Sequence, residues 1–177
     1  MICACGNHCW KVLPPAFVVL VSPADAALLD EPWRVDHDHK GYLTVRRNAR
    51  TADGRRAQKR LAREIVSTSS QLLADHKNRN TLDNRRGNLR EATSRQNAQN
   101  RSKRRTSESG CKGVVRHGKK WRARITINGK QIRLGVFLTK EEASKAYENA
   151  ARVHFGEYAA AGAMPKPLDP SEMRIWR

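Results

Sequence analysis

The sequence lacks long apolar runs and is poor in aromatic residues and cysteine. Its longest apolar stretch, residues 16–21, is far shorter than the ~18 residues of a membrane span and does not resemble the apolar core of a secretory signal. Aromatic residues make up only 6% of the 177 residues, so we expect small, divided cores. Four cysteines, three of them within residues 3–9, do not form the framework of a disulfide-rich secreted domain. The sequence therefore predicts a protein of a reducing compartment with no membrane span.

Negative charge is also scarce, and its shortage is uneven along the chain. Lys and Arg number 35 against 17 Asp and Glu, which gives a formal net charge of +18. Residues 46–105 alone hold 18 basic and 5 acidic side chains, a net of +13. Such a stretch is typical of a surface that binds a phosphate backbone, although a solvated or disordered face is the alternative. Motifs with ordered spacing inside the stretch favour nucleic-acid binding.

The N-terminal third has the pattern of a small β-rich part. Residues 17–21 and 33–35 are β-prone, as are residues 42–45, and residues 26–29 suit a short helix. Residues 50–60 are polar and contain glycine, which predicts a hairpin tip or an exposed loop.

The C-terminal part changes character after a charged, linker-like stretch at residues 101–109. Apolar and polar residues alternate from Trp121 to Ile127, and Asn128-Gly129 is a strong hairpin signal. Thr139 and Glu142 have the spacing of a capping box, which opens a helix that ends near Gly156. We predict a three-stranded antiparallel sheet with one helix packed across a face.

The densest group of chemically useful residues lies between residues 74 and 101. Asp75 and His76 end a predicted strand, a polar loop follows, a second short strand begins at Asn88, and Asn97 lies in the first turn of a predicted helix. Carboxylate and amide oxygens are ligands that Mg2+ accepts while keeping open positions for phosphate and water. A neutral imidazole can take a proton from an attacking water. Because neighbouring side chains of a strand point to opposite faces, Asp75 and His76 can share a site only where the strand ends or twists.

This segment resembles the HNH (ββα-metal) endonucleases of the phage and intron type. The match runs through Asp75-His76, Leu82-Asp83-Asn84-Arg85, Asn88-Leu89-Arg90, Thr93 and Asn97. The resemblance implies a divalent metal, Mg2+ or Mn2+, held by Asp75 and Asn97, with His76 as general base. It also implies that Asn88 holds the loop and orients the imidazole ring.

The chain departs from that family pattern at two positions. Asn97 stands where many members have His, which weakens metal binding but occurs in this branch. Residues 61–66 resemble a family strand in which Ala62 occupies a position usually held by His. We expect Arg79, Arg85, Arg86 and Arg90 to hold phosphates rather than to read bases.

A second candidate surface lies on the C-terminal sheet, on the side opposite the apolar stripe. Alternation places Arg122 and Arg124 on this side, and Arg133 and Arg116 are expected to join them. Residues 110–160 resemble the Apetala/ethylene-response-factor DNA-binding domain, through motifs that include Lys112-Gly113-Val114, Trp121-Arg122-Ala123 and Ala146-Tyr147. The resemblance implies a sheet that lies in the major groove, and fusion to an HNH core is typical of homing endonucleases.

Two weaker motifs leave alternatives open. Cys3, Cys5, His8 and Cys9 could bind a structural zinc ion, but the spacing is cramped, and reduced cysteines in a tight turn are the alternative. The string Asp36-His37-Asp38-His39 suits another branch of nuclease, but no suitably spaced ligands follow it, which favours a polar surface strand.

These observations predict an α+β protein that binds double-stranded DNA, cuts it site-specifically and acts as a monomer. The alternatives are a sequence-specific DNA-binding regulator with an inactive nuclease core, and a packaging or RNA-associated protein. The resemblance implies a phage-encoded protein in the cytoplasm of a bacterial host. The predicted parts are a β-rich segment (1–66), the nuclease core (67–101), a linker (102–109), the DNA-binding domain (110–162) and a tail (163–177).

Overall fold

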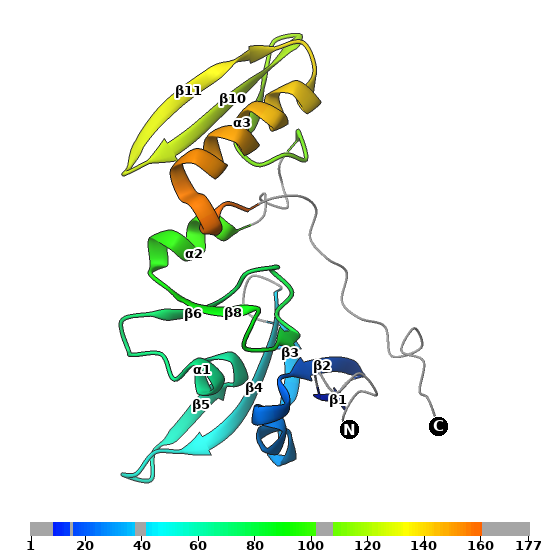
Figure 1. The fold of residues 1–177 in the computed structure, drawn as a ribbon, viewed down its shortest axis with the longest axis vertical. Coiled ribbons are helices and arrows are strands. Elements are labelled where there is room, and N and C mark those ends of the chain that lie inside the picture. Colours follow the sequence, from blue (N-terminus) through cyan, green and yellow to red (C-terminus); the bar gives the residue numbers. More distant parts are fainter. Residues whose placement is uncertain (1–8, 15, 38–41, 102–107, 161–177) are drawn as a thin grey trace. The chain divides into compact units, whose positions relative to one another are not determined.

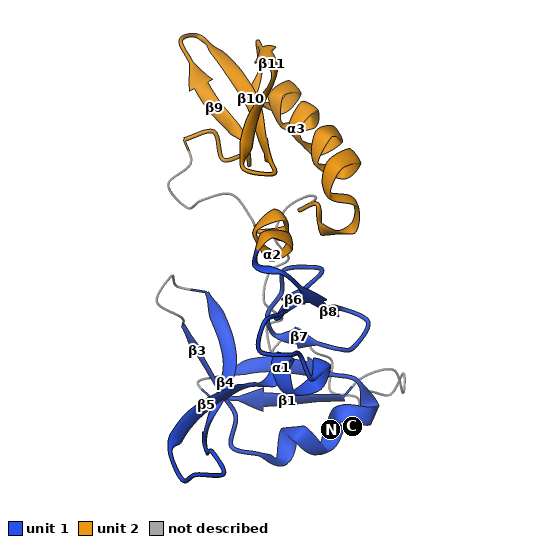
Figure 2. Ribbon diagram, turned by 90° about the vertical axis from the view of Figure 1, so that its left-hand side faces the viewer, with its two compact units in different colours: residues 1–94, 164–177 blue, residues 95–163 orange. Residues whose placement is uncertain are grey.

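A computed structural model describes residues 9–14, 16–37, 42–101 and 108–160. The chain is mixed α+β, as predicted, and divides into two compact units, which are described separately (Figure 2). Unit 1 ends at Ser94, and unit 2 begins at Arg95. None of the helices in the described ranges is long and apolar enough to cross a membrane.

The described residues of unit 1 form three small sheets (Figure 1). Two of them are three-stranded, with strand orders β1-β2-β7 and β3-β4-β5, and β6 pairs with β8 in the third. The strands are β1 (Cys9–Leu13), β2 (Phe17–Val21), β3 (Arg34–His37), β4 (Leu43–Arg50), β5 (Arg56–Arg60), β6 (Leu73–His76), β7 (Asp83–Asn84) and β8 (Leu89–Ala92). A 3-10 helix η1 (Pro23–Asp30), the α-helix α1 (Leu61–Val66) and the first residue of α2 (Ser94–Asn100) complete this unit.

The core of unit 1 joins the predicted N-terminal segment to the predicted nuclease core. β7 pairs in parallel with β2, with Leu20 opposite Asp83, so both segments contribute to one sheet. Leu82 and Leu89 are buried in the same apolar cluster as Val19, Val21 and the side chains of η1, β3 and β4 that face inward. Burial of Leu82 and Leu89 in this cluster helps to hold the loop between β6 and β8 in place.

The segment at residues 61–66 is a helix, so the expectation of a strand there was wrong. Leu61 and Ile65 are four residues apart and both are buried, which places them on one face of α1. Ala62, Arg63 and Glu64 are good helix formers, and Ser67 ends the helix in the left-handed conformation, with φ of 53°. Helix propensity and the spacing of the buried residues therefore both predict the helix that is present, whereas the resemblance implies a strand.

Unit 2 is built on the sheet β11-β10-β9 and a helix across it. Its elements are β9 (Val114–His117), β10 (Lys120–Ile127), β11 (Lys130–Phe137), α3 (Lys140–Phe155) and the 3-10 turn η2 (Gly156–Tyr158). The predicted hairpin at Asn128-Gly129 is confirmed, since Ile127 pairs with Lys130. The predicted capping box is also confirmed, because Thr139 and Glu142 exchange side-chain to backbone hydrogen bonds.

Gly113 is fixed by close packing at the start of unit 2. Its φ is +72°, and a Cβ there would lie 2.1 Å from Cδ2 of Tyr147 and 2.6 Å from the Arg124 carbonyl oxygen. Gly118 has a similar φ of +60° but open space around it. Both glycines therefore adopt a left-handed backbone conformation, but only at Gly113 would an added Cβ clash with neighbouring atoms.

We expect Gly113→Ala to destabilise unit 2 by about 1–3 kcal/mol more than Gly118→Ala, because only the first adds a clash to the cost of a left-handed alanine. Thermal unfolding followed by circular dichroism measures the difference. Equal unfolding midpoints for the two variants would show that Tyr147 moves aside without cost.

Candidate active site

The candidate site is built on the antiparallel strands β6 and β8 and the loop between them. Asp75 lies opposite Arg90 and His76 opposite Leu89. The two predicted strands are confirmed, although the second begins at Leu89 and extends to Ala92. His76 is the last residue of β6, which is the position at which the sequence required the strand to end.

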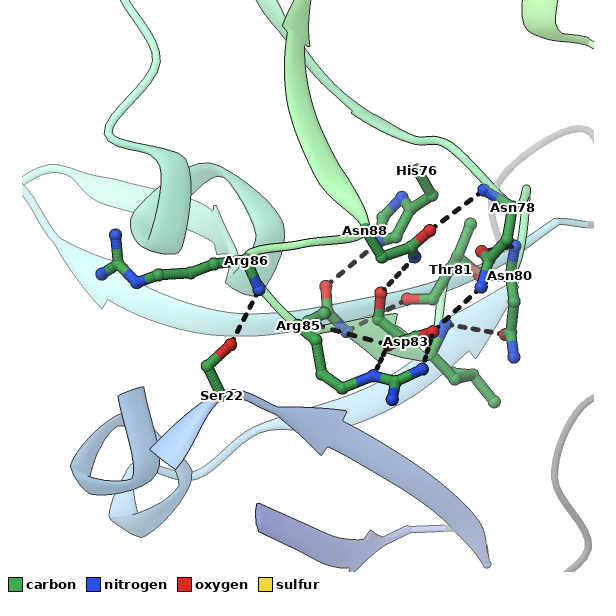
Figure 3. Close-up of polar contacts among 11 residues, drawn as sticks. Ser22, His76, Asn78, Asn80, Thr81, Asp83, Arg85, Arg86 and Asn88 are labelled. Atoms are coloured by element: carbon green, nitrogen blue, oxygen red, sulfur yellow. Dashed lines mark hydrogen bonds and ion pairs between the residues drawn. The ribbon is translucent and has the colours of Figure 1, made fainter. Parts of the chain in front are cut away.

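The loop is held by asparagine and aspartate side chains that replace backbone pairing (Figure 3). Asn88 accepts a hydrogen bond from the Asn78 backbone N–H (3.0 Å) and donates one to the Asp83 carbonyl (2.7 Å). Asn78 donates to Oδ2 of Asp83 (2.9 Å), and its own Oδ1 accepts from the backbone of Asn80. Side chains of this kind mimic backbone turns, which is why an Asn- and Asp-rich sequence forms an ordered loop here. Asn88 thus makes the loop contacts that the resemblance implies.

The imidazole ring of His76 meets Asn84, a residue to which the sequence gave no role. Nε2 of His76 lies 3.2 Å from Oδ1 of Asn84, and the amide nitrogen of Asn84 donates to the Thr81 carbonyl (3.2 Å). Because the second bond fixes the amide orientation, Oδ1 accepts from Nε2–H, and Nδ1 is then the ring nitrogen that can accept a proton. Asn84 is 1% exposed. Asn84 thus contacts the ring directly, and the orienting role expected of Asn88 stays a prediction.

Burial lowers the pKa of His76 below its usual value, and this effect is the largest at the ring. The Asn84 hydrogen bond and the charges of Asp75 and Asp83 act in the opposite direction without cancelling it. The ring is therefore neutral at pH 7, the form that a general base requires.

Asp75 lies in a buried ion pair with Arg90. Nε of Arg90 donates to Oδ2 of Asp75 at 2.8 Å, and the side chains of Arg90 and Asp75 are only 8% and 5% exposed. Arg90 was expected to hold phosphate, but its guanidinium is buried against this carboxylate. Since the pair joins β6 to β8, Arg90 fixes where the Asp75 carboxylate lies.

The other arginines of the loop also have partners in this chain. Arg85 binds both carboxylate oxygens of Asp83 at 2.7 Å. Arg86 binds both oxygens of Asp25 on η1, at 2.8 and 2.6 Å, and its backbone N–H donates to Ser22. Arg79 adopts a left-handed backbone conformation, and burial lowers its pKa. Contact of Arg79, Arg85 and Arg86 with phosphate stays a prediction.

Asn97 lies in α2 and is half-buried. It belongs to unit 2, whereas Asp75 belongs to unit 1. The predicted convergence of Asn97 with Asp75 therefore stays a prediction. The chemistry of the pair fits a hard divalent cation, because a carboxylate oxygen and an amide oxygen are the donors that Mg2+ and Mn2+ accept. Within the described residues no group of three His, Cys, Asp or Glu side chains could hold a metal ion.

The C-terminal sheet has the arginine face that the alternation predicts, with one exception. Arg122 and Arg124 alternate with buried Ala123 and Ile125, and Arg133 pairs with Arg124 across the strands. Arg116 pairs instead with Trp121, and its guanidinium lies 5.2 Å from the centroid of that ring.

The expectation that Arg116 joins the arginine face was therefore wrong, because directly opposed residues share a face of the sheet. Its pairing places Arg116 on the side of Trp121. Contact of the four arginines with DNA stays a prediction.

The two weaker motifs fall largely outside the described residues. Cys3, Cys5 and His8 of the suggested zinc site lie there, and Cys9 begins β1 with 1% exposure inside the apolar core. Asp38 and His39 also lie outside the described ranges. Asp36 and His37 form the end of β3, where Asp36 accepts hydrogen bonds from Arg34 and Arg46. This strand agrees with the polar surface strand that the sequence favours.

Residues 70–99 match the family model described as HNH endonuclease. These residues, the HNH segment below, cover β6, the Asn-rich loop, β7, β8 and most of α2. The chain is also 35% identical over 92 residues to a protein of Acanthamoeba polyphaga mimivirus named as an uncharacterized HNH endonuclease. The aligned part is 51% of this chain and 47% of that protein, so the chain spans about half the length of this relative. The HNH segment is therefore similar to HNH endonucleases.

Proposed function

We propose that the chain is a site-specific, metal-dependent DNA endonuclease of the homing type. The observation that carries the proposal is the His76–Asn84 contact in the HNH segment, because it orients the imidazole ring that would act as the general base. The loop around Asp83 and Asn88 supports this arrangement with side chains that hold the backbone rigidly. A regulator without nuclease activity would have no need for an oriented imidazole at this position.

In the proposed reaction His76 takes the proton of a water molecule that attacks the phosphorus atom. Asn84 keeps the ring in the required tautomer, and Arg90 fixes the Asp75 carboxylate. Asp75 and Asn97 would hold Mg2+ or Mn2+. When bound, such an ion supplies positive charge that stabilises the leaving oxygen and the charge on the phosphate.

We further propose that unit 2 recognises the DNA sequence at which the chain cuts. Arg122, Arg124 and Arg133 form one exposed or half-exposed face, and guanidinium groups make bidentate contacts with guanine in the major groove. A nuclease segment and a separate reading face in one chain fit a monomer bound to double-stranded DNA. The phage-type setting follows from the resemblance of both parts.

Incubation of the full chain with supercoiled plasmid DNA tests the proposed function. We expect nicked or linear plasmid with Mg2+ or Mn2+ and intact plasmid with EDTA. Sequencing of the ends gives the site and the number of strands cut. Sequence-specific binding without strand scission under either metal would instead identify a DNA-binding regulator with an inactive nuclease core.

A further inference from the structure

The hairpin of β4 and β5 (Figure 1) carries arginines at opposed positions, in a pattern that the proposed site does not use. Its cross-strand pairs include Arg46 opposite Arg60, Asn48 opposite Gln58 and Arg50 opposite Arg56. Directly opposed residues point to the same side of a sheet, and so do residues two apart on one strand. These six side chains therefore share one face, here named the ribbon face.

The ribbon face is open to solvent, whereas the reverse side of the hairpin is packed. All six side chains are exposed except Arg46, which is half-buried. On the reverse side Val45 is buried, and Arg47 lies over the ring of Trp33 at 5.2 Å and pairs with Glu31 and Glu64. The cationic side chains on the reverse side are thus paired with other groups of the protein.

The charges of the ribbon face are poorly balanced within the protein. Arg46 shares the carboxylate of Asp36 with Arg34 and donates to Gln58, and Arg50 donates to the Gly54 carbonyl. Within the described ranges the side chains of Arg56 and Arg60 make no hydrogen bond or ion pair. Two arginine pairs face each other directly, and like charges so placed destabilise a sheet. A bound polyanion removes that repulsion.

We propose that the ribbon face lies in the major groove of duplex DNA as a second reading surface. The inference rests on the proposed nuclease function and extends it to a substrate contact in unit 1. β3 pairs with β4 only as far as Arg46, so beyond that residue the hairpin continues as a two-stranded ribbon. Such a ribbon fits the groove, and Arg, Asn and Gln are the side chains that make bidentate contacts with guanine and adenine. From residue 46 to residue 50 a strand advances roughly 14 Å, about four base pairs of B-form DNA. The deep, narrow major groove of RNA duplexes excludes such a ribbon.

Binding of the full chain to a fluorescent random-sequence DNA duplex, measured by anisotropy over a range of salt concentrations, tests the proposal. We expect Arg50→Gln/Arg56→Gln to weaken binding at least about tenfold and to reduce the slope of log K against log salt by about 2. The matched control is Lys140→Gln/Lys145→Gln, which removes the same charge from exposed positions of α3. The control is expected to change affinity less than about twofold, in line with a loss of net charge alone.

A conservative variant separates base reading from charge. Arg50→Lys/Arg56→Lys keeps the phosphate attraction but loses the bidentate fork. When bound sequences are selected from a random pool, this variant is therefore expected to lose the base preference at one short block of positions. Its slope of log K against log salt is expected to match that of the parent. Because the glutamine variant removes two opposed charges, its thermal unfolding midpoint is expected not to fall, which separates lost contact from lost folding.

The outcomes distinguish this proposal from the proposed function. If the parent binds and cuts DNA while the glutamine variant has unchanged affinity, salt slope and selected sequence, the ribbon face is not a reading surface and the nuclease proposal stands. An RNA duplex bound as tightly as DNA, with the same loss in the glutamine variant, overturns the major-groove assignment. A parent chain that neither binds nor cuts duplex DNA overturns both.

Discussion

Replacing His76 by alanine is expected to slow plasmid nicking by about 10²- to 10⁴-fold while binding to duplex DNA is retained. The loss follows from the proposed role of the ring as the group that takes the proton of the attacking water. The rate is measured from the decay of supercoiled plasmid with saturating Mg2+, and binding is measured by anisotropy with EDTA. Retained binding shows that the loss lies in the chemical step.

His154→Ala provides the matched control, because His154 is exposed on α3 and far along the chain from the HNH segment. It should nick at the parent rate. Asn84→Ala should give an intermediate rate, since the ring remains but loses the contact that selects its tautomer. A His76→Ala protein as active as the parent would remove the ring from the mechanism, and the nuclease proposal would fail in its present form.

Removal of the Arg90 side chain is expected to have the largest effect on stability. Arg90→Leu leaves the Asp75 carboxylate buried without its guanidinium, and breaking a buried pair from one side typically costs about 3–5 kcal/mol. Urea denaturation followed by tryptophan fluorescence measures the loss, since Trp33 is buried in the core of unit 1. The double variant Asp75→Leu/Arg90→Leu should recover part of the loss, because both charges are then absent.

The control for this series is Arg55→Leu, whose side chain is 84% exposed in a surface pair with Asp53. Its unfolding midpoint should match that of the parent, because exposed pairs contribute little. An Arg90→Leu protein that unfolds at the parent midpoint would mean that water or another group satisfies Asp75, and the positioning role given to Arg90 would be lost.

The sequence predicts correctly those parts of the fold that depend on residues close together in the chain. The alternation from Trp121 to Ile127, the Asn128-Gly129 turn and the Thr139 cap each act over a few residues, and each is present. At helix α1 the resemblance implies a strand, whereas the four-residue spacing of Leu61 and Ile65 indicates the helix that is present.

Contacts between distant residues could not be predicted in this way. Arg86 meets Asp25, which is 61 positions away, and no periodicity signals such a pair. Asn84 reaches His76 only because the loop folds back over eight residues. The ribbon face needed the register of β4 with β5, since the same arginines read along the sequence indicate only a polar hairpin tip.

The parallel pairing of β7 with β2 bears on how such a chain can be inherited. The HNH segment contributes Leu82 and Leu89 to an apolar cluster whose other members lie outside it, before residue 70. A gene fragment limited to the motif would encode the chemistry while losing the scaffold that shapes it. Recombination that transfers the proposed activity between proteins would therefore have to move the preceding strands together with the motif.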